Sequence, residues 1–211
     1  MEFWNEQVTQ KSWEVLLKIR KLPFGFILIG GWANYLWTHA MKSKDIDIVI
    51  AEFTDLDYLK RGFDLRKNDS LRKYEIKVDG IDVDIYVPYF SRLAIPVEDI
   101  RKYSTTIEGF TVASPALLLV LKQGAELDRK DSVKGEKDRV DIINLLFCAD
   151  VDFGLYRGLL REYGLGHYLP RLKSIIASFK ETRYVGMTPR QLKLRKKEVL
   201  GKLASTAGGT R

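Results

Sequence analysis

Three segments of the chain show the hydrophobic patterns of β-strands. Residues 26–29 form a continuous apolar run, Phe-Ile-Leu-Ile, between two glycines, which is typical of a strand buried on both faces. Residues 45–50 and 81–87 alternate between polar and apolar side chains. Because side chains alternate across a strand, we expect the aspartates of each segment to point to one face.

Turn signals and helical periodicity predict further elements around these strands. Asp79-Gly80 is a strong hairpin signal and predicts an antiparallel pair over residues 72–87. The charged segment 127–136 has no periodic pattern and is predicted to be a mobile loop. Apolar residues at helical spacing, together with Ser-Pro and Thr-Pro starts, predict helices at residues 2–21, 32–40, 116–127, 137–148, 152–163, 167–181 and 188–203.

Composition narrows the class of protein. A hydrophobic content of 45% and a charged content of 30% fit a globular protein, and the longest apolar runs are far below a membrane span. The N-terminus shows no signal-peptide pattern, so we expect a cytoplasmic location and no membrane partner. Cys148 is the only cysteine, which excludes an intrachain disulfide and a cysteine metal cluster.

The net charge of +7 is unevenly distributed. Residues 151–211 carry 13 Lys and Arg against 4 Asp and Glu, whereas the first 150 residues carry 22 against 24. We therefore predict a domain over 1–150, a basic helical region over 151–203 and a disordered tail over 204–211. Such a basic end favours an acidic partner, with RNA or tRNA first, although a solvated lysine-rich helix explains the charge equally well.

The candidate chemistry lies between the first two strands. Gly30-Gly31 makes a turn into a helix, whose exposed N–H groups and positive end suit a phosphate. Asp45 and Asp47 then present two carboxylates from one strand, and Mg²⁺ prefers such oxygen ligands while keeping room for substrate phosphates. Together these residues predict a site for a nucleoside triphosphate with Mg²⁺.

Each of these features also has a purely structural interpretation. A Gly-Gly pair is usually only a turn, and alternating aspartates are common on the solvated face of an edge strand. Their occurrence in this order, at short spacing between apolar strand patterns, favours the functional interpretation.

These residues resemble the nucleotidyltransferase superfamily typified by DNA polymerase beta. The resemblance rests on Gly30-Gly31, Asp45-Ile46-Asp47 and a later strand acid, and it covers roughly residues 25–147. Segments 112–129 and 135–146 are most similar to the abortive-infection type, which includes toxins of toxin–antitoxin systems. The resemblance implies an α+β protein with the nucleotidyltransferase fold, which is a small mixed sheet flanked by helices, and with a helical C-terminal region.

The resemblance also implies roles for individual residues. Asp45, Asp47 and Asp84 would hold two Mg²⁺ ions, with Mn²⁺ as an alternative metal and Asp82 as the alternative third carboxylate. Ser43 stands where the family often has Ser or Thr, beside the nucleotide. Lys122 would steady the triphosphate, although it could instead be a lysine that extends from a core helix to the surface. Asp138 or Asp141 would orient Lys122 or an acceptor group, although an ordinary ion pair on the helix face is an equal alternative.

The expected reaction is transfer of a nucleoside monophosphate from a nucleoside triphosphate to a hydroxyl acceptor. The acceptor could be RNA, a protein or a small molecule, and a partner protein would fit a toxin–antitoxin role. A different class stays open, namely a non-catalytic module that binds nucleotides, a partner or nucleic acid on the same fold.

Overall fold

The computed structural model describes residues 3–205, and this part of the chain divides into two compact units at Ser114–Pro115. We call them the N-terminal unit and the C-terminal unit. The division follows compactness and groups residues 115–148 with the later helices. The boundary predicted at residue 150 followed charge and stays a prediction. Of the predicted tail, Ala204 and Ser205 end the last helix, and 206–211 lie outside the described residues.

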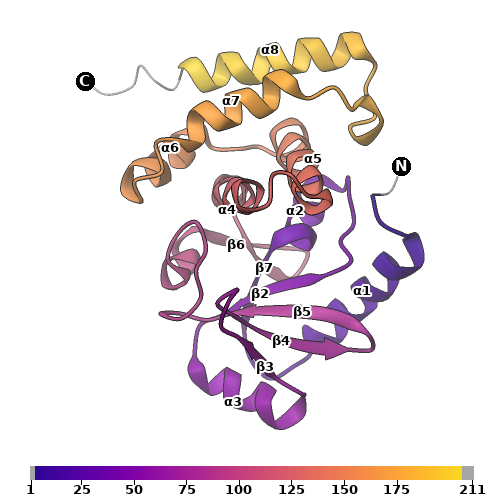
Figure 1. Cartoon of the computed structure of the whole chain (residues 1–211), viewed down its shortest axis with the longest axis vertical. Helices are drawn as coiled ribbons and strands as arrows, with labels where there is room; N and C mark the ends of the chain where they lie inside the picture. Colours follow the sequence, from indigo (N-terminus) through magenta and orange to yellow (C-terminus); the bar gives the residue numbers. More distant parts are fainter. Residues whose placement is uncertain (1–2, 206–211) are drawn as a thin grey trace. The chain divides into compact units, whose positions relative to one another are not determined.

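The N-terminal unit is built on a mixed sheet (Figure 1). Its strand order among the described residues is β3-β4-β5-β2-β1-β7-β6. β1 runs antiparallel to β2 and parallel to β7, while β2 and β5 are parallel. The strands are β1 Phe26–Ile29, β2 Ile46–Ile50, β3 Arg66–Asn68, β4 Lys73–Val78, β5 Ile81–Tyr86, β6 Ser104–Ile107 and β7 Phe110–Ala113. The predicted α+β class with a mixed sheet and flanking helices is confirmed.

The helices of the N-terminal unit pack against the central strands of this sheet. They are α1 Glu6–Ile19, α2 Gly30–Thr38, α3 Phe53–Gly62 and the 3₁₀ helix η1 Val97–Tyr103. α2 packs on β1 and β2, α1 contacts β5, and α3 contacts β2. Trp32 of α2 is buried and donates its indole N–H to Ser12 Oγ of α1 at 2.8 Å, which joins the two helices. Ile46, Ile48 and Ile85 are fully buried, so one set of alternating positions forms the core.

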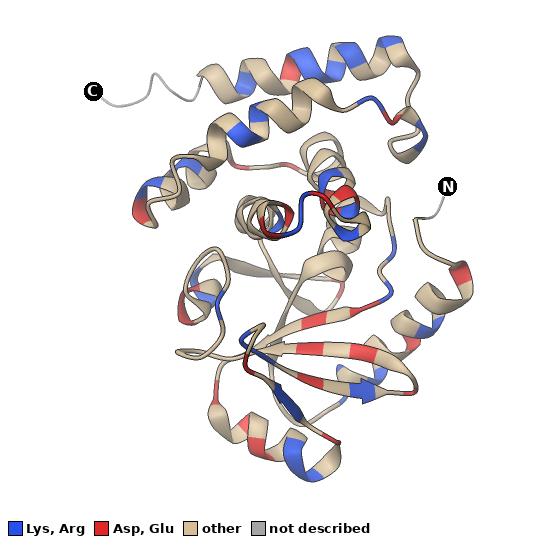
Figure 2. Cartoon of the chain, viewed as in Figure 1, with Lys and Arg blue, Asp and Glu red and all other residues tan. Residues whose placement is uncertain are grey.

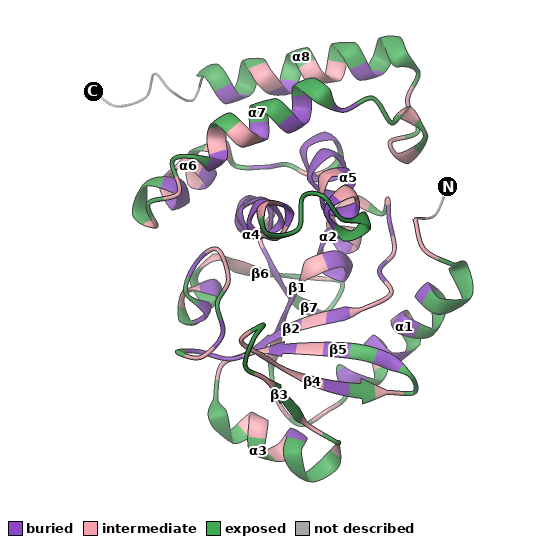
Figure 3. Ribbon diagram, viewed as in Figure 1, coloured by how far each residue is buried: buried purple, intermediate pink, exposed green. Residues whose placement is uncertain are grey.

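The C-terminal unit is helical and centres on α4. Its helices are α4 Pro115–Asp128, α5 Val133–Cys148, α6 Phe153–Glu162, α7 Tyr168–Ser178, the 3₁₀ helix η2 Thr182–Tyr184 and α8 Pro189–Ser205. α4 is buried along most of its length and packs against α5, α6 and α7 (Figure 3). The prediction of a loop over 127–136 is wrong in extent, because α5 begins at Val133. Ser132 caps the start of this helix, since its Oγ accepts from the Gly135 N–H.

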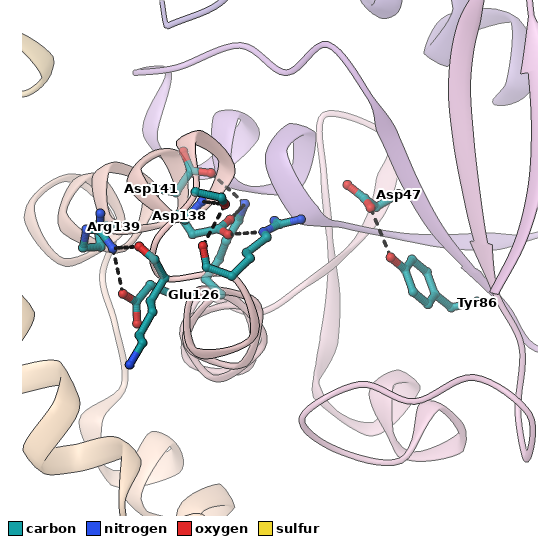
Figure 4. A network of polar contacts seen from close by, with 11 residues as sticks. Asp47, Tyr86, Glu126, Asp138, Arg139 and Asp141 are labelled. Atoms are coloured by element: carbon teal, nitrogen blue, oxygen red, sulfur yellow. Dashed lines mark hydrogen bonds and ion pairs between the residues drawn. The ribbon is translucent and has the colours of Figure 1, made fainter. Parts of the chain in front are cut away.

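Buried polar groups of α4 tie the other helices to it. Glu126 is 0% exposed and accepts from Arg139 of α5 and from Arg171 of α7 (Figure 4). Gln123 donates to the Tyr168 carbonyl at 2.8 Å and accepts from the Tyr156 hydroxyl at 2.5 Å. These contacts fix the register of α5, α6 and α7 against α4, because buried polar groups must find their partners. Between residues 3 and 205, no helix has the length and apolarity needed to cross a membrane.

Glu126→Ala should lower the free energy of unfolding by about 3 kcal/mol, because removal of one partner from a buried ion pair leaves the other charge uncompensated. Glu198 is a matched control, since it also pairs with two cations, Arg195 and Lys202, but is 44% exposed. Glu198→Ala should cost far less stability than Glu126→Ala, because water screens an exposed ion pair. Urea unfolding of both variants tests this, and equal costs would contradict it.

Candidate active site

Two of the predicted site aspartates lie side by side at the centre of the sheet. In the parallel pairing of β2 with β5, Asp47 is directly opposite Asp84. Opposed residues of neighbouring strands point to the same face, so the two carboxylates share one surface of the sheet. The two carboxylates also affect each other's charge: burial and the charge of Asp47 together raise the pKa of Asp84 to about 6, against the opposing effect of Lys73.

The other two aspartates occupy different environments. β2 begins at Ile46, so Asp45 precedes the strand and the predicted boundary at residue 45 is one residue early. Asp45 nevertheless remains two positions before Asp47, at the same end of β2. Asp82 is 61% exposed and lies 3.1 Å from Lys77 Nζ. Its position at the solvated end of β5 makes it the weaker choice for the third carboxylate.

The two glycines are required by close contacts with the acid segment. Gly30 begins α2 with a φ of +68°, and a Cβ there would lie 2.1 Å from Asp47 Oδ2. A Cβ on Gly31 would lie 2.4 Å from Ser43 Oγ. The start of α2 therefore rests directly on Asp47 and Ser43. The N-cap residue of α2 is Ile29, which has no polar side-chain atom with which to cap the helix. The first N–H groups of α2 are therefore suited to an anion.

Lys73 of β4 belongs to this surface, although the sequence analysis missed it. Its Nζ lies 2.6 Å from Asp84 Oδ2 and 3.1 Å from Glu75 Oε1. The pairing of β4 with β5 places Glu75 opposite Asp84. The Asp79-Gly80 hairpin signal could have revealed this, because an alternating register counted back from that turn brings residues 73 and 75 to the face of Asp84.

A second residue missed by the sequence analysis is Tyr86. It follows Asp84 by two positions on β5, and its hydroxyl donates a long hydrogen bond of 3.5 Å to Asp47 Oδ1 (Figure 4). It therefore helps to orient Asp47 on the polar face of the sheet.

The donor set suits Mg²⁺ in type, because carboxylate oxygens are its preferred protein ligands. Within residues 3–205, however, no three His, Cys, Asp or Glu side chains are grouped closely enough to hold a metal ion among themselves. Mg²⁺ commonly binds to one or two carboxylates and completes its shell with substrate phosphates and water. Asp45 and Asp47 beside the α2 N-terminus fit that mode, with Asp84 next to Asp47.

Lys122 lies in the C-terminal unit, within a buried cluster of charges. Its Nζ is 2.7 Å from Asp141 Oδ2 and 3.2 Å from Asp138 Oδ1, so both aspartates orient it. Arg129 also pairs with Asp138, and Lys137 pairs with Asp141 at 2.5 Å. Burial alone would raise the pKa of Asp138, but Lys122 and Arg129 outweigh it and the pKa is lowered. The role of Lys122 toward a triphosphate stays a prediction.

Comparisons with known proteins give likenesses of fold. No family model and no curated protein matches the sequence. JHP933 from Helicobacter pylori matches over 96% of both chains, with 14% identity and a TM-score of 0.50. TM1012 from Thermotoga maritima, provisionally assigned as a nucleotidyltransferase, matches with 21% identity and a TM-score of 0.43, over 62% of this chain and 91% of its own.

An antigenic nucleotidyltransferase-like protein from Paracoccidioides brasiliensis matches over 67% of this chain and 76% of its own, with 16% identity and a TM-score of 0.42. At such identities a match shows the fold alone, and the abortive-infection subtype stays a prediction.

Gly30→Ala should lower the free energy of unfolding by at least about 1 kcal/mol, because an L-residue is strained at this φ and its Cβ would displace Asp47. Gly62→Ala is the control, since nothing lies within 4 Å of its added methyl group. That substitution, at the end of α3, should be neutral or stabilising. Denaturant unfolding compares the two, and indistinguishable midpoints would show that the close approach at Gly30 is unimportant.

Proposed function

We propose that this protein is a Mg²⁺-dependent nucleotidyltransferase, which moves a nucleoside monophosphate from a nucleoside triphosphate to a hydroxyl acceptor and releases pyrophosphate. One observation carries the proposal: Asp47 and Asp84 are opposed on neighbouring strands, and Asp47 lies directly against the glycine start of α2. An uncompensated charge is unfavourable at the centre of a sheet. Two carboxylates at this place therefore favour a site that binds a cation or transfers a proton.

Each residue of this surface then has a task. Asp45 and Asp47 hold the metal, which when bound neutralises phosphate oxygens and activates the acceptor hydroxyl. The first N–H groups of α2 bind a phosphate, and Ser43 fixes the backbone of Gly31 at that helix start. Asp84, with its pKa near 6, accepts the proton of the acceptor hydroxyl, because a base titrating just below neutral pH is ionised and still able to take up a proton.

The positive charge of α8 supports RNA as the acceptor, although only some of its cations are available to contact an RNA. Three of its cations have structural partners: Arg195 donates to the Phe147 carbonyl, Lys196 donates to the Ala177 and Phe179 carbonyls, and Lys202 pairs with Glu198. These contacts complete the ends of α5 and α7. They reduce the like-charge repulsion that α8 would otherwise suffer.

The remaining cations of α8 form an exposed stripe, which we define as Arg190, Lys193 and Lys197 (Figure 2). The three residues recur at three- and four-residue spacing, opposite the buried Leu192, Val199 and Leu203. A basic stripe on one helix face suits contacts with consecutive phosphates of a polynucleotide. The same stripe favours the second candidate function, an RNA-binding module without catalysis.

The first test separates these two candidates. The intact protein, incubated with each labelled triphosphate, Mg²⁺ and total tRNA, should transfer label to an acceptor. Asp45→Asn and Asp47→Asn should reduce transfer to background, because each removes a metal ligand. Asp82→Asn is the matched control and should retain activity, since Asp82 is exposed and paired with Lys77. Transfer by the Asp47 variant would refute the assignment, and RNA binding without transfer by the intact protein would favour the second candidate.

Replacement of all three stripe residues by Gln should weaken RNA binding and reduce the slope of log affinity against log salt by roughly 2, because each phosphate contact on a single strand contributes about 0.7. The control removes three exposed cations from the N-terminal unit, namely Lys21, Lys60 and Arg61. Fluorescence anisotropy with labelled tRNA at several salt concentrations measures both effects. An equal loss in the control, or no RNA binding by the intact protein at low salt, would contradict the RNA proposal.

A further inference from the structure

A lysine is held among the carboxylates of the candidate site. The Lys73 side chain is only 12% exposed, and its ammonium lies 2.6 Å from Asp84 and 3.1 Å from Glu75. Lys77 follows four positions later on the same face of β4 and pairs with the directly opposed Asp82, yet it is 65% exposed. Lys73 instead reaches Asp84 diagonally, because Glu75 is the residue opposite Asp84, and of the two lysines only Lys73 is enclosed.

The enclosure of Lys73 matches an electrostatic need of the acid pair. The Asp84 side chain is only 17% exposed and lies opposite Asp47, so the two carboxylates repel each other where water screens their charges weakly. An ammonium within hydrogen-bond distance of Asp84 offsets that repulsion. Glu75 shares Lys73 but also accepts from the Asn68 amide at 3.0 Å and is more exposed. The main partner of Lys73 is therefore Asp84.

This contact limits what else Asp84 can bind. Mg²⁺ requires oxygen lone pairs in near-octahedral geometry, and the ammonium already engages Asp84 Oδ2. A second divalent ion at Asp84 would also lie close to the positive charge of Lys73.

We propose that Lys73 supplies the second cation of this site, so that the protein binds a single divalent ion at Asp45 and Asp47. The inference rests on the proposed function and departs from the two ions that the family resemblance implies. Lys73 acts as a positioning residue: it fixes the carboxylate of Asp84 beside Asp47 and leaves one of its oxygens to face the acceptor hydroxyl.

The test counts ions directly, without turnover. Mn²⁺ is titrated into the full-length protein, and the free ion is followed by electron paramagnetic resonance. The intact protein should bind one ion per chain. Lys73→Met should bind a second ion at least roughly tenfold more tightly than the intact protein does, because a like charge at close range has been removed. Adding Asp84→Asn to Lys73→Met should abolish that second site.

Lys77→Met is the matched control, because it removes the same charge from the same face and strand. It should bind one ion, as the intact protein does, and circular dichroism checks that each variant is folded. Two ions bound by the intact protein, or no additional ion bound by folded Lys73→Met, would overturn the inference while leaving the proposed reaction standing. Binding of no ion by any variant would overturn both. One bound ion without transfer in the labelled-triphosphate assay would overturn the reaction alone.

Discussion

The N-terminal unit depends on the enclosure of two opposed carboxylates at the middle of a sheet. Asp47 and Asp84 occupy strands whose other positions form the apolar core, and both are only partly exposed, so bulk water solvates their charges incompletely. The surrounding structure answers this constraint in several ways. Lys73 pairs with Asp84, Tyr86 donates to Asp47, and the first residues of α2 bring the positive end of a helix against the same carboxylate.

The C-terminal unit solves a related problem with alternating charges. Five side chains form a row in which each charge contacts one of opposite sign, in the order Arg129, Asp138, Lys122, Asp141 and Lys137. Complete burial lowers the pKa of Lys137, and the charge of Lys122 adds to this effect, although Asp141 opposes it. A buried ion-pair cluster adds little stability for its size, because desolvation offsets most of the attraction. Its main effect is to specify how α5 lies along α4.

The sequence predicted the fold well where hydrophobic period and turn chemistry agree. The apolar run of β1, the Asp79-Gly80 hairpin and the Ser-Pro start of α4 each determine their element locally, and all three are present. The start of α5 was missed because one serine cap outweighs a run of charged residues. Asp45 and Asp47 could be proposed from their spacing beside Gly30-Gly31, and their role stays a prediction. Lys73 was missed because its place beside Asp84 appears only when the register of the β4–β5 hairpin is counted back from Asp79-Gly80.

The contact between Gly31 and Ser43 links two positions that are twelve residues apart. The hydroxymethyl group of Ser43 occupies the volume into which any side chain at position 31 would project. The two positions therefore share one small space, and position 31 can gain a side chain only where position 43 becomes smaller. In relatives that keep this helix start we expect residues 31 and 43 to vary together, with glycine at 43 wherever 31 gains a methyl group. Such compensated pairs would identify chains that inherited this helix start even where their overall sequence identity is too low for a reliable alignment.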